Sequence, residues 1–436
     1  MVTIYIEKRS PRVEFIFNHL FKRMLGCPFT ITSDEKKYLN SSCPVICYAK
    51  NYTGKGIHIV PHRLLFEKGT RPVEIEVSYW EDLPIFFRTL EGEIPFDLFA
   101  ASFYLITRYE EYLEEELDKH GRYPAEKSLA FRHNFLTRPI VDQWAIRLKK
   151  IVQDTYPEIV FNTPRFQFIP TIDVDSVYAY RHKGPFINGY HLLKEIFSGK
   201  FRKAKHRLLV ILRQQEDPFF NFGKVTALHQ DCGTLPIFFF HCGGYGKYDK
   251  KTFFPSYKYR DVKKDISRDF LVGLHPSYRA AFSLFHFRME RKKMESCIMD
   301  KSVSHNRFHY LRFRVPESYL MLSREGIAHD WSMGYSNYPG FRAGTSFPFR
   351  FYNLHNERTY KLMVHPFTVM DKTLKMDLGL NEEESKQYML DLAQEVKAVN
   401  GTFVTLFHNE NLTDAFSWKG WRQMYRSLLK EVMDMC

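Results

Sequence analysis

The sequence predicts an α/β protein with two domains: a smaller α+β accessory domain over residues 1–160 and a larger (β/α) domain over residues 161–436. From about residue 161 onward, short β-like runs alternate with helical patterns, which indicates parallel strands covered by helices, in a barrel or in a doubly wound sheet. The roughly 270 residues of this part suit a barrel of seven or eight units. The boundary lies near residues 157–164, where the composition shifts modestly and two prolines occur.

The accessory domain shows a less regular order of elements. Apolar residues at helical spacing predict helices over residues 11–25, 96–117 and 141–156, and β-like runs predict strands over residues 44–49, 56–62 and 73–80. His120 and His133 lie here without a cluster of other metal-ligating residue types, so we expect both to be structural.

In the larger domain the elements follow one another with short separations. Strands are expected over residues 166–172, 235–241, 271–275, 310–315, 361–369 and 401–408, and helices over residues 257–270 in part, 278–299, 316–325 and 382–399. α/β sheets place their chemistry at the carboxyl ends of the strands. Polar residues that close these runs are therefore the candidates for a functional site.

The composition narrows the class of protein. A hydrophobic content of 44% and an aromatic content of 16% are ample for a buried core. The seven cysteines are scattered, odd in number and without a CxxC pair, which is typical of a reduced protein. The first residues show no signal-peptide pattern, and no apolar run approaches the roughly 18 residues of a membrane span. We therefore expect a cytoplasmic location.

The net charge of +13 is unevenly distributed, with nine Lys or Arg and one Glu between residues 179 and 215. Such a block attracts phosphate groups, whether in nucleic acid, anionic lipid or a sugar phosphate. The alternative is a solvated helix face. Because no nucleic-acid-binding module accompanies the charge, nucleic acid is not expected as a partner.

The segment FQFIPTIDVD is the most informative part of the chain. Side chains alternate across a strand, so Asp173 and Asp175 leave the same face at its carboxyl end. Two carboxylates there suit a divalent metal, or a general base beside a metal ligand. The structural alternative is a helix N-cap or a turn, where Asp is also common.

Histidines occur at or beside three other β-like runs. His275 ends LVGLH, His309 lies in NRFHYLRF and His408 ends GTFVTLFH. One Asp and two His form an open three-ligand site for Zn²⁺, with cobalt, nickel or iron as alternatives. A metal lowers the pKa of water and polarises a carbonyl oxygen, while a carboxylate and a further histidine can move protons. These residue types predict metal-assisted hydrolysis of an amide or ester.

In this order, TIDVD, GLHPSY, NRFHYLRF, GFRAGTSFPF and TLFHNENL resemble a divergent branch of the polysaccharide deacetylase family, similar to carbohydrate esterase family 4. The resemblance covers residues 166–436 and implies a distorted (β/α) barrel with a metal held by one Asp and two His. The first 160 residues resemble an accessory domain found before this branch in bacterial proteins.

The resemblance implies a role for each matching residue. Asp173 would be the catalytic base and Asp175 a metal ligand, although Val174 separates two aspartates that are adjacent in the family, which leaves the roles open to exchange. His275 would be a second ligand. Position 279, where the family has its other histidine, is Arg, so His309 is the candidate third ligand and His305 its competitor.

The remaining motifs place the other catalytic groups. Arg342 in GFRAG would orient the base, although Gly344 replaces the proline of the family motif. His408 would be the general acid. Tyr278 and Arg307 are candidate substrate contacts, whereas Asp330 and Asp371 are expected to be structural. The aromatic stretch over residues 331–351 could stack on sugars or pack within a long loop.

The leading hypothesis is a metal-dependent hydrolase that removes an N- or O-acetyl group from a carbohydrate. The expected substrate is a polysaccharide or a surface-glycan precursor, which could be linked to phosphate or lipid. The basic block over residues 179–215 would then contact that phosphate or an anionic membrane surface. The altered motifs also fit a non-catalytic carbohydrate-binding or scaffold barrel, and the Asp-x-Asp pattern fits a glycosyltransferase less well.

Overall fold

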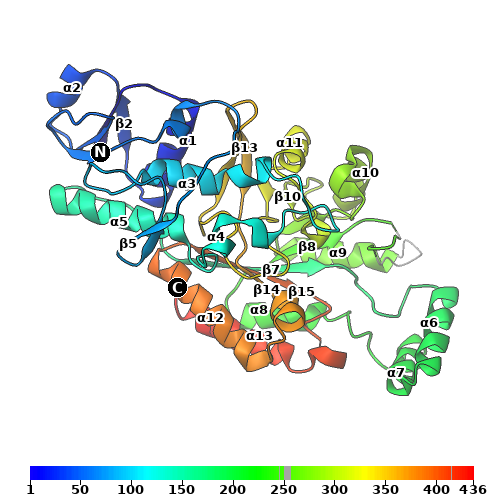
Figure 1. Cartoon of the computed structure of the whole chain (residues 1–436). Coiled ribbons are helices and arrows are strands. Elements are labelled where there is room, and N and C mark those ends of the chain that lie inside the picture. The colour runs from blue at the N-terminus through cyan, green and yellow to red at the C-terminus, as the bar shows by residue number, and fades with distance from the viewer. Residues whose placement is uncertain (245, 250–256, 414) are drawn as a thin grey trace.

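The computed structural model describes residues 1–244, 246–249, 257–413 and 415–436 (Figure 1). The first sheet consists of β1 (Val2–Ile6), β2 (Phe29–Thr32), β3 (Val45–Tyr48) and β4 (Ile57–Ile59). These strands run parallel in the order β2-β1-β3-β4, so the expected α+β arrangement is wrong in this respect. The other strands of this part, β5 (Ser78–Trp80) and β6 (Leu83–Ile85), form a separate antiparallel pair.

Helices pack around the first sheet, and local signals fix where they begin and end. The longer ones are α1 (Pro11–Phe17), α3 (Leu98–Ile106) and α5 (Ile140–Thr155), while α2 (Glu35–Leu39) and α4 (Leu129–Arg132) are short. The Asp97 side chain caps α3 by accepting from the amides of Phe99 and Ala100. The helix expected over residues 96–117 ends early because Arg108 takes a left-handed conformation with φ 56°.

The second sheet contains nine strands and confirms the expected α/β class with parallel strands. Its order is β12-β13-β11-β10-β9-β8-β7-β15-β14, and β12 alone runs antiparallel to its neighbour in the described residues. The strands are β7 (Gln167–Val174), β8 (Ile237–His241), β9 (Val272–His275), β10 (His305–Asn306), β11 (His329–Asp330), β12 (Phe349–Asn353), β13 (Arg358–Val364), β14 (Val369–Met370) and β15 (Thr402–His408).

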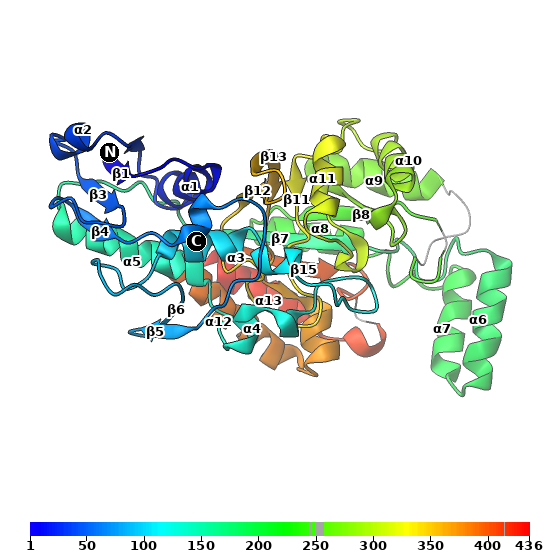
Figure 2. The same cartoon turned by 45° about the horizontal axis from the view of Figure 1, so that its top comes forward.

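Helices cover the outer face of this sheet (Figures 1 and 2). A small apolar cluster lies on its other face. The covering helices are α8 (Phe222–Asp231), α9 (Tyr257–Asp269), α10 (Leu284–Glu295), α11 (Glu317–Arg324), α12 (Glu382–Ala398) and α13 (Trp421–Met433). In β8, Ile237 and Phe239 belong to the inner cluster, whereas Phe238 and Phe240 pack in the large core with the helices. Both faces are thus buried, as parallel sheets require.

The sheet wraps around the inner cluster without closing into a ring in the described part of the chain. The cluster combines residues of strands from both halves of the sheet: Ile237, Phe239, Leu311, Trp331, Phe367, Met370, Val404 and Leu406. The terminal strands β12 and β14 form no ladder with each other among the described residues. The closed barrel that the sequence led us to expect is therefore not shown.

One expected strand is wrong and another is divided. Residues 310–315 do not form a strand, because Tyr310 and Leu311 have φ angles of 61° and 50° and lie in a 3₁₀ turn over His309–Leu311. The strand of this unit is the shorter β10, which precedes that turn. The run over residues 361–369 contains the end of β13 and the start of β14. Within the described ranges, no helix combines the length and apolar composition needed to cross a bilayer.

Buried ion pairs join the two parts of the chain. Arg12 on α1 donates from Nε to Glu357 at 2.9 Å, and Arg342 binds Glu111 through two bonds of 2.8 Å. The side chains of Arg12 and Arg342 are 0% and 2% exposed. Because such charges are costly to bury alone, each pair holds the first 160 residues firmly against the second sheet.

His19, on the π-helical turn over Asn18–Met24, predicts a specific pH dependence of stability. Neither ring nitrogen has a hydrogen-bond partner among the described residues, and burial, with Arg23 nearby, lowers the pKa of His19 to about 3. The unfolded chain takes up this proton near pH 6.5, so the folded state loses stability as the pH falls below that value. Between pH 7 and pH 5 this loss is about 2 kcal/mol.

The substitution His19→Leu should therefore remove about 2 kcal/mol from the difference between the unfolding free energies at pH 7 and pH 5. Denaturant titrations of both proteins at the two pH values measure this. The control is His355→Leu, on an exposed histidine, which should leave the pH dependence as in the parent. An unchanged pH dependence in His19→Leu would mean that His19 is protonated in the folded protein.

Candidate metal centre

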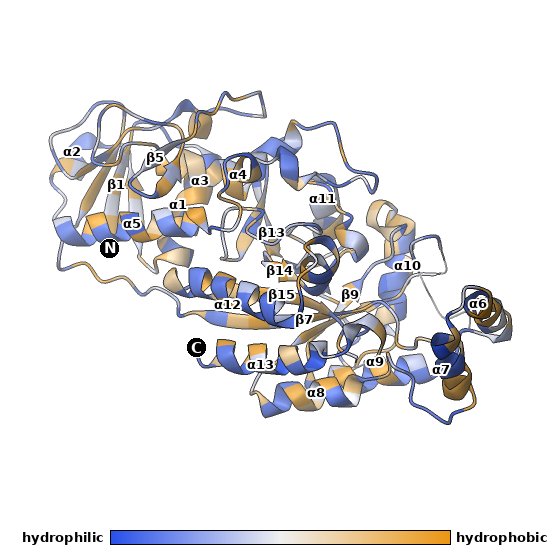
Figure 3. Cartoon of the chain, turned by 60° about the horizontal axis from the view of Figure 1, so that its bottom comes forward, coloured by the Kyte–Doolittle hydropathy of each residue, from blue (hydrophilic) through white to orange (hydrophobic). Residues whose placement is uncertain are grey.

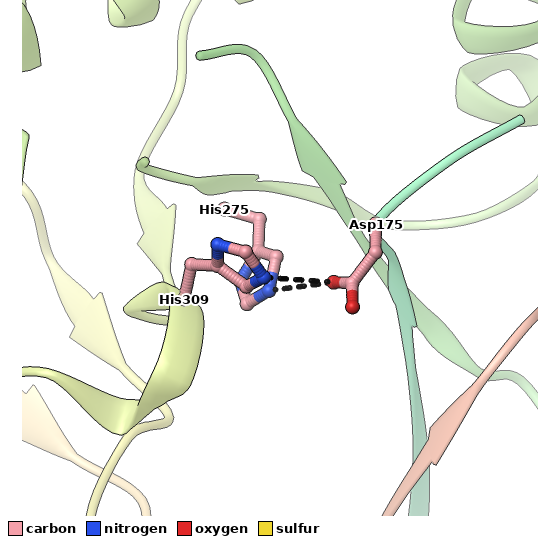
Figure 4. A group of neighbouring side chains, drawn as sticks. All are labelled: Asp175, His275 and His309. Atoms are coloured by element: carbon pink, nitrogen blue, oxygen red, sulfur yellow. Dashed lines mark ion pairs between the residues drawn. The ribbon is translucent and has the colours of Figure 1, made fainter. Parts of the chain in front are cut away.

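Three side chains from three units of the sheet meet at the carboxyl ends of its strands (Figure 4). Asp175 follows β7, His275 ends β9 and His309 lies in the turn after β10. The Asp175 Oδ1 atom lies 3.2 Å from His275 Nε2 and 3.6 Å from His309 Nε2. The ligand atoms of the three residues lie within 4.8 Å of one another, which is the spacing of a metal site.

The charge of Asp175 fits a divalent cation. Asp175 Oδ1 is buried without a hydrogen-bond partner among the described residues. Burial alone would raise the pKa of Asp175, but His309 and Lys372 hold this pKa well below its usual value, so the carboxylate is ionised. A set of one carboxylate and two imidazoles suits zinc and similar metals and leaves a coordination position open.

Hydrogen bonds orient both histidines for this role. Nδ1 of His275 donates to the carbonyl oxygen of Arg307 at 2.6 Å, and Nδ1 of His309 donates to Asp249 Oδ1 at 3.0 Å. These bonds leave each Nε2 facing Asp175. Burial lowers the pKa of His309, but Asp175 and Asp249 outweigh this effect and raise the pKa to about 9. Metal-binding histidines commonly have such partners, which fix the ring and strengthen the ligand.

His241, which ends β8, is a further histidine of the site, and the sequence did not lead us to predict it. Its Nε2 lies 3.7 Å from Asp249 Oδ1, and neither of its nitrogens has a hydrogen-bond partner among the described residues. Burial, with His309 and His275 beside it, lowers the pKa of His241 to about 3, so it is neutral. His241, Asp249 and His309 form a second group at metal-ligand spacing.

Asp173 and His408 lie next to each other in the sheet, because they are register partners of β7 and β15. Asp173 Oδ2 is 3.7 Å from His275 Nε2, and Asp173 Oδ1 has no hydrogen-bond partner in the described chain. Nδ1 of His408 donates to Asp371 Oδ1 at 2.8 Å. Burial and Lys372 lower the pKa of His408, but Asp371 outweighs them and the net shift is upward.

Asp371 and Lys372 follow β14. Asp371 lies beside His408, and Lys372 lies beside Asp175. Asp371 accepts hydrogen bonds from the His408 ring, the His408 amide and Asn411, so its structural role includes fixing the His408 ring. Lys372 Nζ lies 3.5 Å from Asp175 Oδ2 and 3.4 Å from Glu410. Burial lowers the pKa of Lys372, but Glu410 and Asp175 raise it by more. The net shift is upward, so the ammonium group stays charged.

The predicted substrate residues have different positions. Arg307 is fully buried beneath Asp173, with Nη1 3.9 Å from Asp173 Oδ1, and its Nη2 donates to Thr171 at 2.8 Å. It therefore contacts the predicted base rather than a surface that a substrate could reach. Tyr278 is half-buried, and its amide donates to Asp249 Oδ1 at 3.0 Å.

Tyr278 belongs to a group of rings that borders the site. Its centroid lies 4.3 Å from that of Tyr248 and 5.7 Å from that of Tyr310, the residue after His309. His120 from the first part of the chain contacts all three rings, and its Nδ1 is 3.3 Å from the Tyr278 hydroxyl. His120 therefore brings the accessory part of the chain to the edge of the site.

Arg342 does not lie where the family motif implies. Its guanidinium binds Glu111 and the carbonyl of Gly334 and stacks on Phe313, and no ion pair with Asp173 exists in the described chain. Gly344 follows in a left-handed conformation with φ 67°, which proline cannot adopt. The loop that carries the motif has thus turned toward the accessory part, and Arg307 is the arginine beside Asp173.

His305, the competitor of His309, lies elsewhere in the sheet. Trp331 Nε1 donates to His305 Nδ1 at 3.0 Å. The His305 ring stacks on that of His329, with 4.5 Å between the ring centroids. Asp330 accepts from Asn306 and Ser332, which is the structural role that we expected. Of the two candidate histidines, the geometry therefore brings His309 and not His305 to Asp175.

Sequence reasoning overlooked His241, Asp249 and Lys372. The run LPIFFFH ends in a histidine in the same way as GTFVTLFH, and this signal could have identified His241. Lys372 lies three positions after the β-like run over residues 361–369, so its place near a strand end could also have been noticed. Asp249 lies in a loop after β8 without a periodic pattern, and only the folded chain places it beside His309.

Asp249 offers a test of how the ligands are held. The substitution Asp249→Asn removes the charge beside His309 Nδ1 and should weaken metal binding roughly 10- to 100-fold without changing the stoichiometry. Competition titration with a chromophoric chelator measures the affinity. Asp377→Asn, the same change on an exposed residue, is the control. If the parent protein bound two ions per chain and Asp249→Asn bound one, Asp249 would instead be a direct ligand of a second ion.

Comparisons with known proteins give little direct information. Residues 2–157 match the model of a family of unknown function, DUF7033. No curated protein matches the chain. Because the family model spans well under half of the chain, it describes the accessory part alone.

Solved structures show distant likenesses. A putative polysaccharide deacetylase from Mycobacterium smegmatis has a TM-score of 0.41 and 11% identity over 63% of this chain and 86% of that chain. A 4-alpha-glucanotransferase from Thermococcus litoralis has a TM-score of 0.36 and 10% identity over 62% of this chain and 38% of that one. The 7,8-dihydropteroate synthase from Vibrio fischeri has a TM-score of 0.28 and 8% identity over 62% of this chain and 92% of that chain. TM-scores below 0.5 at such identities do not place the chain in any of these classes.

Proposed function

We propose that this protein is a metal-dependent hydrolase that removes an acyl group, most readily acetyl, from a carbohydrate. The observation that carries the proposal is the convergence of Asp175, His275 and His309 at metal-ligand spacing, beside Asp173 and the Asp371–His408 pair. The ligands, the candidate base and the candidate acid come from four different strand ends of one sheet, and Asp371 follows a fifth. Such a combination suits metal-assisted hydrolysis.

Each residue would have a distinct task. A divalent ion held by Asp175, His275 and His309 would supply Lewis acidity toward the carbonyl oxygen of the substrate. Asp173 would take the proton of the attacking water, with the positive charge of Arg307 3.9 Å from its Oδ1 atom. His408, whose pKa Asp371 raises, would give its proton to the departing amine or alcohol. Lys372 would add positive charge where the oxyanion develops.

The carbohydrate part of the proposal is supported by the rings of Tyr248, Tyr278 and Tyr310. They are half-buried beside His309 and could stack on the apolar face of a sugar. The order of the sequence motifs, which resemble polysaccharide deacetylases, supports the same substrate class.

The proposal is tested by purifying the protein without chelator and measuring bound metals by elemental mass spectrometry. We expect about one zinc, cobalt, nickel or iron ion per chain. The metal-loaded protein should then release acetate from acetylated sugars, and chelation should abolish the release. Failure of the protein to bind any of these ions, even when they are added, would refute the proposal.

One observation favours a second candidate, a carbohydrate-binding protein without catalysis. The Lys372 ammonium lies 3.5 Å from Asp175 Oδ2, where it can neutralise the ligand carboxylate in place of a metal. If this is its function, Lys372→Ala should convert a metal-free protein into one that binds Zn²⁺. In the hydrolase, the parent protein binds metal already and the substitution lowers activity only.

A further inference from the structure

A pair of helices stands away from the rest of the molecule. Helices α6 (Pro185–Phe197) and α7 (Phe201–Ile211) form an antiparallel hairpin that projects away from the second sheet in both views (Figures 1 and 2). The hairpin is inserted after Asp175, between β7 and α8. Its position places it on the side of the sheet where the strands β7 and β15 carry the candidate site.

The hairpin has its own internal support. Arg207 on α7 binds Glu195 on α6 through bonds of 2.9 and 2.7 Å, and its guanidinium lies 4.4 Å from the ring centroid of Tyr180. Glu195 and Arg207 are both buried. At its base, the carboxylate of Asp217 accepts from the amides of residues 179–181. The two helices are therefore held together without needing their outer faces for packing.

The outer face of α6 is apolar. Phe186, Tyr190, Leu193 and Phe197 follow at intervals of four, three and four residues, which places them on one side of the helix. They are 90%, 64%, 56% and 86% exposed. Phe201 and Leu208 on α7, and Leu212 directly after it, follow a similar spacing and are also exposed. Figure 3 shows hydrophobic positions along both helices of the hairpin. Soluble surfaces rarely expose so many large apolar side chains.

Basic residues accompany this apolar surface. Lys194, Lys200, Arg202, Lys203, Lys205 and Arg213 are all exposed. Glu195 is the one acidic residue between residues 179 and 215, and Arg207 already neutralises it. The outer surface of the hairpin is therefore positively charged and apolar at once.

We propose that the α6–α7 hairpin docks this protein onto the surface of an anionic lipid bilayer. Exposed aromatic and aliphatic side chains in a helical stripe, flanked by lysine and arginine, are the features with which a helix lies in the headgroup region. The charge of the hairpin complements that of acidic phospholipids. Phe186, Tyr190, Leu193 and Phe197 would enter the boundary of the acyl chains, while the basic side chains contact lipid phosphates.

An open pocket of about 550 Å³ at the base of the hairpin supports this choice of partner. Gly184, Pro185, Leu192 and Ile211 contribute to its lining, and it contains no acidic side chain. An acyl chain could enter there. Nucleic acid would use the positive charge but would not require Leu193, Leu208 and Leu212 to be exposed, so the aliphatic part of the surface favours lipid.

The test is co-sedimentation with vesicles of phosphatidylcholine alone and of phosphatidylcholine mixed equally with phosphatidylglycerol. The parent protein should bind the mixed vesicles and not the neutral ones. The double variant Phe186→Ser, Phe197→Ser should lower the partition coefficient about tenfold. The triple variant Lys200→Glu, Arg202→Glu, Lys205→Glu should lower it about 100-fold.

Matched controls carry equivalent changes far from the hairpin. Tyr79→Ser with Leu90→Ser removes two exposed apolar side chains, and Lys8→Glu with Lys50→Glu and Lys68→Glu reverses three exposed charges. Both controls should bind like the parent if the hairpin is the docking element. Circular dichroism confirms that each variant is folded, and no metal or turnover is needed, so the outcome is independent of the proposed hydrolase.

Three results would overturn the inference. The first is no binding of the parent to the mixed vesicles. The second is equal losses in the hairpin variants and the controls, which would show that net charge or general surface properties decide binding. The third is binding of single-stranded RNA that the triple variant loses while the serine variant keeps its vesicle binding, which would assign the basic residues to nucleic acid instead.

Discussion

Asp173→Asn is expected to lower kcat for deacylation by about 10³-fold and to leave the bound metal at the parent stoichiometry. The amide cannot accept a proton from water, whereas Asp175, His275 and His309 remain in place to hold the ion. His275→Ala should instead remove the metal and the activity together, since only two ligands are left. Elemental analysis and acetate release on the same preparations measure both quantities.

The control for these variants is His305→Ala. His305 is also a strand-borne histidine, but it contacts Trp331 and His329 and not Asp175. This variant should keep its metal and its kcat. Retention of full metal in His275→Ala would remove His275 from the ligand set. Loss of metal in Asp173→Asn would mean that the two aspartates exchange roles, as the Asp-x-Asp spacing permits.

The sequence was sufficient to predict the groups that local pattern places at strand ends. Period-two alternation and the apolar runs identify β7, β9 and β15, and the polar residue that closes each run is Asp173, His275 or His408. Parallel strands then bring these ends to one edge of the sheet without further information. His309 could be recognised as a candidate, although its segment was expected to be a strand and is a turn.

Features that depend on the packing of distant segments could not be predicted in this way. Asp249 orients His309 across 60 positions of the sequence, and the loop that carries it has no periodic pattern. The spacing of β12 and β14 at opposite ends of the sheet depends on how far the sheet curves around its inner cluster. Nothing in the length or alternation of the elements distinguishes a closed ring from this open arrangement.

The position of Arg342 is the clearest example of a motif whose residue is retained but whose contact differs. A family pattern implies that it orients the base, but a buried carboxylate of the accessory part, Glu111, binds it instead. The contact joins residues that are 231 positions apart. Because Glu111 lies in an acidic run that reads as the solvated end of a helix, the sequence alone gave no reason to expect it as a buried partner.

Arg342→Met should therefore lower the unfolding free energy by about 3 kcal/mol, which is the loss expected when one partner of a buried ion pair is removed. Glu111 would keep Arg108 as a partner at 2.8 Å, so the effect should lie at the lower end of the usual range. The stacking of the guanidinium on Phe313 would also be lost. Denaturant titration measures the change.

Arg288→Met is the matched control, because Arg288 binds Glu325 through two similar bonds of 2.9 and 2.7 Å but is exposed. It should affect stability far less, since water screens the exposed guanidinium of Arg288. At a temperature where both variants are folded, Arg342→Met should retain its metal and nearly all of its kcat, while Arg307→Met, beside Asp173, should lose activity and retain metal. If Arg342→Met kept its stability and lost kcat, Arg342 would act on the base after all, and the contact with Glu111 would not be what fixes this residue.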